Sequence, residues 1–213
     1  MRSQRRLVSP QVWEIADIND GLIGYYKLNE SVAGPVINEV GTDAVNYGAQ
    51  INQQGAFGTS YNFNRNSRIQ IPTTISGLSE FSISWYAITD VYSSPNTYFG
   101  GWNVNSWYIR IQNDYIEVGL VTNENGRTTY AFSNDSQIAT WEHFVFKWKS
   151  GESPTLFVDK IEYTHPTIHT GTLVSGATEV IGALTGAVHS FNGRMDEIRF
   201  YNKKIDIATI NSL

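Results

Sequence analysis

The sequence predicts an all-β fold in which two antiparallel sheets pack face to face, followed by a short C-terminal helical turn. Aromatic residues make up 13% of the 213 positions, and short apolar runs are broken by turn residues along the chain. This pattern is typical of β-sandwiches. No helix-length amphipathic pattern occurs between Leu22 and Lys203, which argues against a parallel α/β sheet. A chain of this length buries roughly 70% of its unfolded surface, enough for one sizeable core.

The strands are predicted from alternating apolar and polar residues and from apolar runs that end at turn residues. Asn113-Asp114 is typical of a tight hairpin turn. We expect Trp85, Trp141 and Phe144 to be largely buried. The expected strands are residues 22–28, 61–63, 68–71, 81–88, 107–112, 115–121, 128–132, 141–149, 155–159, 180–182 and 191–201.

The last residues predict one helical turn. Asp206 stands where a helix N-cap would, ahead of the apolar residues Ile207, Ile210 and Leu213. We also expect the N-terminal and C-terminal strands of the sandwich to lie close together.

The first twenty residues differ from the rest, so we divide the chain into an N-terminal arm (1–20) and one domain (21–213). Residues 1–6 are basic, and no apolar stretch of signal-peptide length follows them. An exposed Trp on a free tail would be a liability, so we expect part of the arm to dock on this domain or on a neighbouring subunit. The expected anchors of this assembly arm are Val12, Trp13 and Ile15.

Charge and cysteine content exclude several classes of protein. The formal net charge is −5, which argues against a nucleic-acid-binding surface. There is no cysteine, so neither a disulfide framework nor a thiolate metal site can form. No segment of the sequence is long and apolar enough to span a membrane.

Several segments, in the same order along the chain, resemble one family. They are a Gly-led apolar run at 21–28, a Tyr-x-Phe block at 61–65 with the strand after it, alternating Phe, Ile and Trp at 81–87, aromatic strands at 141–148 and 156–159, and a closing strand at 191–202 that holds an Asp-Glu pair. Together they resemble laminin-G-like jelly-roll domains of the concanavalin A-like lectin and glucanase superfamily. Asn64-Arg65 departs from the family's Asp-Gly, and Lys160 stands where Gly is common. The resemblance implies a jelly roll, a fold that hosts lectins, glycosidases, adhesion modules and viral structural proteins.

No acid pair is placed for hydrolysis. Retaining glucanases of this superfamily carry acids at alternate positions of one strand, which puts them on one face, and this spacing is absent here. Asp196 and Glu197 are adjacent, so a regular strand would point them to opposite faces. We therefore expect a protein that is not an enzyme.

Metal ligands are also sparse. Asp196 is the position most similar to a calcium ligand of relatives, but such a cation takes about six to eight oxygens. The sequence offers one good acid there, so we expect Asp196 to pair with a basic residue or cap a backbone group. We expect no metal and no other cofactor.

The densest cluster of aromatic and amide residues is at 98–108. Sugars stack on Trp and Tyr rings while Asn side chains bind their hydroxyls, so this segment is a candidate site for carbohydrate or partner contact. The alternative is that its rings are core residues or an ordinary cross-strand row. The candidate residues are Tyr98, Trp102, Asn103, Asn105 and Tyr108.

These observations predict a non-enzymatic binding or assembly module. We expect a phage or viral structural component, such as a capsid decoration, head-fibre or tail protein, located in the virion and oligomeric. Its partners would be protein subunits of a larger assembly and cell-surface glycans, with no nucleic acid and no membrane. The alternatives are a free-standing carbohydrate-binding lectin or adhesion module, extracellular or at the cell surface, and a disfavoured glycoside hydrolase.

Overall fold

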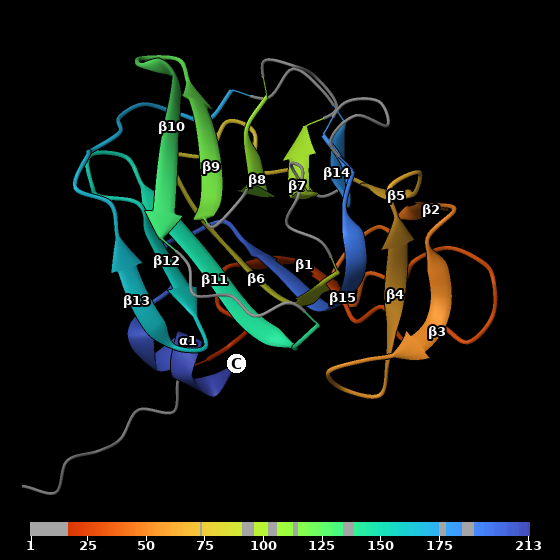
Figure 1. Ribbon diagram of the computed structural model, residues 1–213. Helices are drawn as coiled ribbons and strands as arrows, with labels where there is room; N and C mark the ends of the chain where they lie inside the picture. The colour runs from red at the N-terminus through yellow and green to blue at the C-terminus, as the bar shows by residue number, and fades with distance from the viewer. Residues whose placement is uncertain are drawn as a thin grey trace, which may run out of the picture.

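The computed structural model describes residues 17–72, 74–90, 96–101, 106–112, 115–133, 139–174, 178–184 and 190–213. Two antiparallel sheets face each other, and one short helix lies near the C-terminus (Figure 1). The predicted all-β sandwich is confirmed. Within the described residues, no helix is long and apolar enough to cross a membrane.

The first sheet contains the closing strand and most of the long strands. Its strands, in spatial order, are β13 (Ile161–Thr164), β12 (Thr155–Val158), β11 (Glu142–Lys149), β6 (Glu80–Thr89), β15 (Asn192–Tyr201), β4 (Thr59–Asn64) and β3 (Gln50–Gln54). In addition, β1 (Leu22–Tyr26) pairs with the end of β15, with Leu22 opposite Tyr201. The first and last strands therefore lie side by side, as expected.

The second sheet is formed mainly by the middle of the chain. Its strands, in spatial order, are β10 (Gly126–Ser133), β9 (Tyr115–Thr122), β8 (Tyr108–Gln112), β7 (Asn96–Gly101), β14 (Glu179–Ile181), β5 (Arg68–Ile71) and β2 (Val45–Tyr47). The strands β2, β3, β7 and β13 are not among the expected strands, and β7 lies inside its sheet, between β8 and β14. The other three, β2, β3 and β13, lie at sheet edges, where one side of the strand stays unpaired and side chains are exposed, so their apolar alternation is weak.

The core lies between the two sheets and is rich in aromatic rings. Trp85 of β6 has no exposed surface; its ring stacks on that of Phe144 at 5.1 Å and meets that of Phe99 edge-on at 5.0 Å. The predicted burial of Trp85 and Phe144 is confirmed. Trp141, which directly precedes β11, is only half-buried, and the guanidinium of Arg194 lies over its ring.

The C-terminal helix α1 (Ile207–Ser212) is where the sequence predicted it. The side chain of Asp206 accepts a hydrogen bond from the backbone N–H of Thr209 at 2.7 Å, as an N-cap does. Ile205 and Ile210 pack on Val145 and Tyr201, which belong to the face of the first sheet that points away from the core. One part of this outer face is therefore covered by the C-terminal segment.

Candidate functional site

The outer face of the first sheet presents polar side chains from its two central strands. Along β6, Trp85 points into the core, so Ser82, Ser84 and Tyr86 point outward. Ser82 Oγ donates a hydrogen bond to the carbonyl oxygen of Lys203 and accepts one from the N–H of Ile205. These two bonds hold the C-terminal segment against the sheet.

A second segment, the turn that joins β3 to β4, covers the face from the other side. Its Phe57 is 56% exposed, and the Phe57 ring meets the Tyr86 ring edge-on at 5.1 Å. The backbone N–H of Phe57 donates to Oδ2 of Asp196 at 2.9 Å. A Cβ on Gly55 would lie only 2.6 Å from the same oxygen, so glycine is what allows the turn to approach Asp196 so closely.

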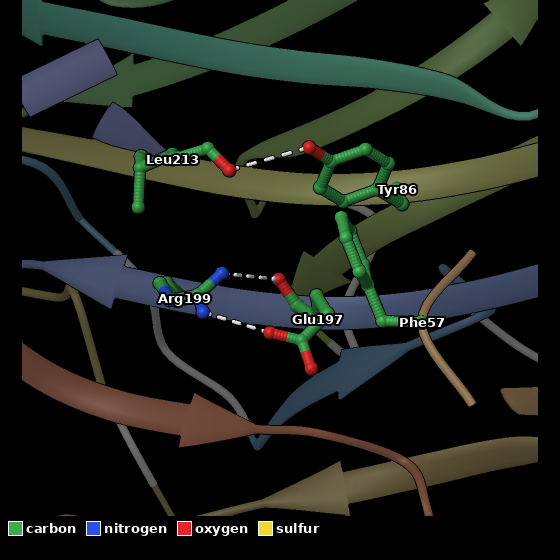
Figure 2. Close-up of a pocket in the computed structure, with 5 residues that line it drawn as sticks. All are labelled: Phe57, Tyr86, Glu197, Arg199 and Leu213. Atoms are coloured by element: carbon green, nitrogen blue, oxygen red, sulfur yellow. Dashed lines mark hydrogen bonds and ion pairs between the residues drawn. The ribbon is translucent and has the colours of Figure 1, made fainter. Parts of the chain in front are cut away.

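Between these two segments an open pocket remains, with a volume of about 270 Å³. Its lining residues are Phe57, Tyr86, Glu197, Arg199 and Leu213. Figure 2 shows Glu197 and Arg199 side by side on β15, with the Phe57 ring next to that of Tyr86. The hydroxyl of Tyr86 donates to the carbonyl oxygen of Leu213 at 3.3 Å, so the C-terminal segment forms one wall.

The floor of the pocket is an ion pair. Arg199 Nη2 lies 2.7 Å from Oε2 of Glu197 and donates to the hydroxyl of Tyr25 at 2.8 Å. The Tyr25 hydroxyl donates in turn to the same Glu197 oxygen at 2.5 Å. A carboxylate, a guanidinium and a phenol thus form one closed network that offers polar edges to the pocket.

A β-bulge brings the two acids of β15 to the same face. Asp196 pairs with Tyr86 and Arg199 with Ser84, so three steps on β15 match two on β6, and Glu197 within the bulge has a positive φ of 53°. The expectation that Asp196 and Glu197 face opposite ways is wrong, because it assumed an uninterrupted alternation. Their carboxylates lie on one side of the sheet, one under the β3–β4 turn and one in the pocket.

Asp196 has no exposed surface, and burial raises its pKa to about 7. The N–H of Phe57 opposes this shift, whereas the neighbouring Glu197 adds to it. Asp196 therefore caps backbone groups, as expected from the sequence. Among the residues that the structure describes, no group of three or more His, Cys, Asp or Glu side chains could hold a metal ion.

His143 lies beside Tyr86, opposite it on the neighbouring strand β11. Its ring stacks on that of Tyr86 at 4.4 Å, and its Nε2 is 2.8 Å from Oγ of Ser84. Burial, helped by the positive charges of Arg199 and Lys160, lowers the His143 pKa to about 4. The imidazole is consequently neutral near pH 7 and acts as a flat support for Tyr86.

The structure places the aromatic cluster predicted at 98–108 differently from what a surface site requires. Tyr98 has no exposed surface; a register shift between Thr97 and Phe99 turns its ring inward against Trp85, where the ring centroids are 5.4 Å apart. Tyr98 is therefore a core residue and not a ligand contact. Tyr108 is 6% exposed, and its hydroxyl donates to Glu117 at 2.7 Å.

The remaining predicted contacts lie outside the described residues. This applies to Trp102, Asn103 and Asn105 and to the arm anchors Val12, Trp13 and Ile15. The residues of the pocket, in contrast, were not predicted as a site. An exposed aromatic residue in a Gly-x-x-Gly turn at Gly55–Gly58 was the one signal in the sequence that could have indicated it.

Two packed antiparallel sheets, with the first and last strands side by side in one of them, form a sandwich of the jelly-roll class. A family model described as the concanavalin A-like lectin/glucanases superfamily matches residues 63–211, which is more than half of the chain. The protein belongs to this superfamily. The match includes Tyr86, Glu197 and Arg199 but not Tyr25 or Phe57. No curated protein matches the chain in sequence.

Solved structures similar to this one include receptor-binding domains of bacterial toxins. The binding domain of Paraclostridial Mosquitocidal Protein 1 aligns with a TM-score of 0.72, 14% identity, and coverage of 92% of this chain and 52% of that one. A botulinum neurotoxin type C structure, described by the dependence of its cell entry on two ganglioside molecules, aligns with a TM-score of 0.65 and 14% identity, and the alignment covers 92% of this chain and 51% of that one. The binding domain of botulinum neurotoxin DC in complex with SialylT aligns with a TM-score of 0.67 and 15% identity, and the alignment covers 91% of this chain and 50% of that one. The chain thus spans about half the length of these domains, and the likeness shows the fold.

Proposed function

We propose that this protein is a carbohydrate-binding module and that its ligand site is the pocket over β6 and β15. The observation that carries the proposal is the exposed ring of Phe57 standing beside a floor of hydrogen-bonding groups. A sugar ring has apolar C–H faces that stack on an aromatic side chain and hydroxyls that bind to polar edges. Phe57 and Tyr86 supply the first kind of contact, and Glu197 and Arg199 supply the second.

The comparisons support a binding module in general. The similar toxin domains are binding domains, and two of them are described with gangliosides or with SialylT. Their ligand contacts do not transfer to this chain, because identity is 14–15% and half of each domain has no counterpart here. The position of the site is therefore argued from the pocket alone.

The pocket is small and open, so one copy should bind weakly. Covering about 60–80 Å² of apolar surface with one sugar ring contributes roughly 1.5–2 kcal/mol. Together with a few hydrogen bonds this reaches roughly the 4 kcal/mol of a millimolar affinity. Several copies on one assembly would raise the avidity by a factor of about 100 or more.

The test is a comparison of two exposed aromatic residues. Phe57→Ala should weaken glycan binding about tenfold, because the stacking surface is lost. Tyr47→Ala should leave binding unchanged, since Tyr47 is 42% exposed but lies on β2, at an edge of the other sheet. Titration of both variants and the wild type against a glycan panel measures the difference. Equal binding by Phe57→Ala and wild type contradicts the proposed site, and no binding of any glycan contradicts the function.

We propose that binding occurs without hydrolysis. Glu197 is engaged by Arg199 and Tyr25, and Asp196 is buried under the β3–β4 turn, so neither carboxyl is free to act as nucleophile or acid. The same titrations, followed for released products, should show no turnover. Product formation that disappears in Glu197→Gln would show an enzyme instead.

Membership of a phage or viral particle and the assembly role of the arm stay predictions, because the arm residues 1–16 lie outside the described part of the chain. Sedimentation of the chain, beside Trp13→Ala, tests the role of the arm: weaker assembly in that variant would support it, and unchanged assembly would count against it. Purification of the native protein within a large particle, and not alone, would support the virion prediction.

A further inference from the structure

We infer that the pocket selects neutral sugars and discriminates against acidic ones such as sialic acid, an inference that rests on the proposed carbohydrate site. The argument depends on the charged groups at the pocket and on whether any cation there is free to meet an anionic ligand.

Arg199, the basic residue that lines the pocket, is already bonded to other residues of the protein. The guanidinium of Arg199 bonds to the Glu197 carboxylate and the Tyr25 hydroxyl through Nη2. Its Nη1 donates to the carbonyl oxygen of Glu197 at 3.4 Å. One face of the guanidinium is covered by the Tyr25 ring, 4.1 Å away, and the side chain is 12% exposed. The charge of Arg199 is therefore balanced by Glu197 before any ligand arrives, so a carboxylate ligand gains little attraction from it.

The other basic groups of the surrounding elements also have partners. Lys147 and Lys160 donate to carbonyl oxygens of the C-terminal segment, and Arg194 donates to that of Gln54 beside the β3–β4 turn. Lys203 forms an ion pair with Asp20. None of these four side chains lines the pocket.

The acidic groups outnumber the basic one at this site. Asp196 and Glu197 lie next to a single guanidinium, so the site is neutral or negative whichever state Asp196 adopts. A sialic acid carboxylate in this pocket would lie near the Glu197 carboxylate, and the positive charge of Arg199 is already paired with Glu197. Like charges about 4 Å apart repel even in a water-like environment, whereas the hydroxyls of a neutral sugar can use the same polar edges.

The experiment compares one neutral oligosaccharide with the same oligosaccharide extended by a terminal sialic acid, at low ionic strength. The wild type should bind the neutral form at least about fivefold more tightly, the ratio that one such repulsion gives. Glu197→Gln should narrow or reverse this preference, because Arg199 loses its counter-charge. Glu152→Gln is the matched control: Glu152 also forms an ion pair, with Lys204 at 2.7 Å, but it does not line the pocket, so the preference should stay as in the wild type.

The outcomes separate the two proposals. Equal or tighter binding of the sialylated form by the wild type overturns the inference and leaves the carbohydrate site standing. An unchanged preference in folded Glu197→Gln also overturns it, since the charge would not be the cause. Binding of neither form contradicts the proposed function itself. The wild-type comparison needs no variant, so it decides the matter even where Glu197→Gln does not fold.

Discussion

At the scale of single residues, two adjacent acids on β15 have separate tasks. Glu197 is in the pocket and is held by Arg199 and Tyr25. Asp196 has no exposed surface and holds the backbone of the β3–β4 turn, and thereby the exposed ring of Phe57. Because its Oδ1 has no hydrogen-bond partner, few hydrogen bonds offset the cost of burying the negative charge of ionised Asp196. The residue that positions Phe57 therefore lowers the stability of the fold when it is charged.

The first prediction concerns Asp196 and pH. Its pKa is about 7 in the folded protein and about 3.9 in an unfolded chain. Between these values the folded state binds more protons, so the stability contributed by Asp196 falls as pH rises from about 4 to about 7. Asp196→Asn should remove this fall. Relative to the wild type, the variant should gain about 2–4 kcal/mol between pH 4 and pH 8.

Chemical denaturation across this pH range measures the difference. Glu179, whose pKa burial also raises to about 7, lies on β14 of the other sheet and is present in both proteins. Its effect cancels in the comparison. If the free energy of unfolding changed with pH in the same way in the wild type and in Asp196→Asn, Asp196 would not be the cause of the predicted fall.

At the scale of elements, two segments that are distant in the sequence form the walls of the pocket. Phe57 of the β3–β4 turn contacts the ring of Tyr86, and Leu213 of the C-terminal segment accepts a hydrogen bond from the Tyr86 hydroxyl. Helix α1 anchors that second wall, since Ile210 packs on the outer face of the sheet and Lys160 donates to the carbonyl oxygen of Asn211. The position of α1 therefore sets one side of the candidate site.

The second prediction concerns the cap of this helix. Asp206→Ala should lower the free energy of unfolding by about 1 kcal/mol, because the N–H of Thr209 loses its acceptor. Asp206→Asn keeps an acceptor and should cost only a few tenths of a kcal/mol, roughly. The bond from the Thr209 N–H holds the pKa of Asp206 below its usual range. The cost of Asp206→Ala should therefore be full above about pH 4 and shrink as pH falls through the folded pKa. Urea denaturation at several pH values measures it, and equal losses in the two variants would show that the cap is not the cause.

At the scale of the whole molecule, the two sheets enclose an aromatic core, and the first sheet connects this core to its outer face. Trp85 alternates along β6 with Ser84 and Tyr86, so the strand that contributes Tyr86 to the pocket also carries a central residue of the core. Phe144 and Phe99 contact Trp85 from the two different sheets. Packing of the core therefore fixes the position of Tyr86 under the pocket.

The third prediction follows from this packing. Trp85→Ala should lower the free energy of unfolding by about 3–5 kcal/mol, because it leaves a large cavity between the sheets. Trp141→Ala is the control, since Trp141 is half-buried at the edge of the core and should cost less than about 2 kcal/mol. Chemical denaturation of both variants gives the two values. Similar losses would mean that Trp85 is not the central packing residue.

The sequence by itself determined the architecture. Alternation along the segments that became β6, β11 and β15 predicted half-buried strands, and Asp206 before three apolar residues predicted α1. These are local signals, because they depend on the spacing of residues within one segment. The arrangement of strands followed from the resemblance of the closing strand and five earlier segments to one superfamily, which the family match confirmed.

The tertiary structure alone decided which residues meet at the candidate site. One extra residue at Tyr98 and one at Glu197 shift the strand register, and each shift sends a side chain to the face opposite to the one that alternation predicts. Phe57 comes from a turn beside an edge strand with little apolar pattern, and Leu213 comes from the far end of the chain. A bulge depends on pairing with the neighbouring strand, and the pocket depends on which distant segments cover one face of a sheet. Neither is encoded in the periodicity of a single segment.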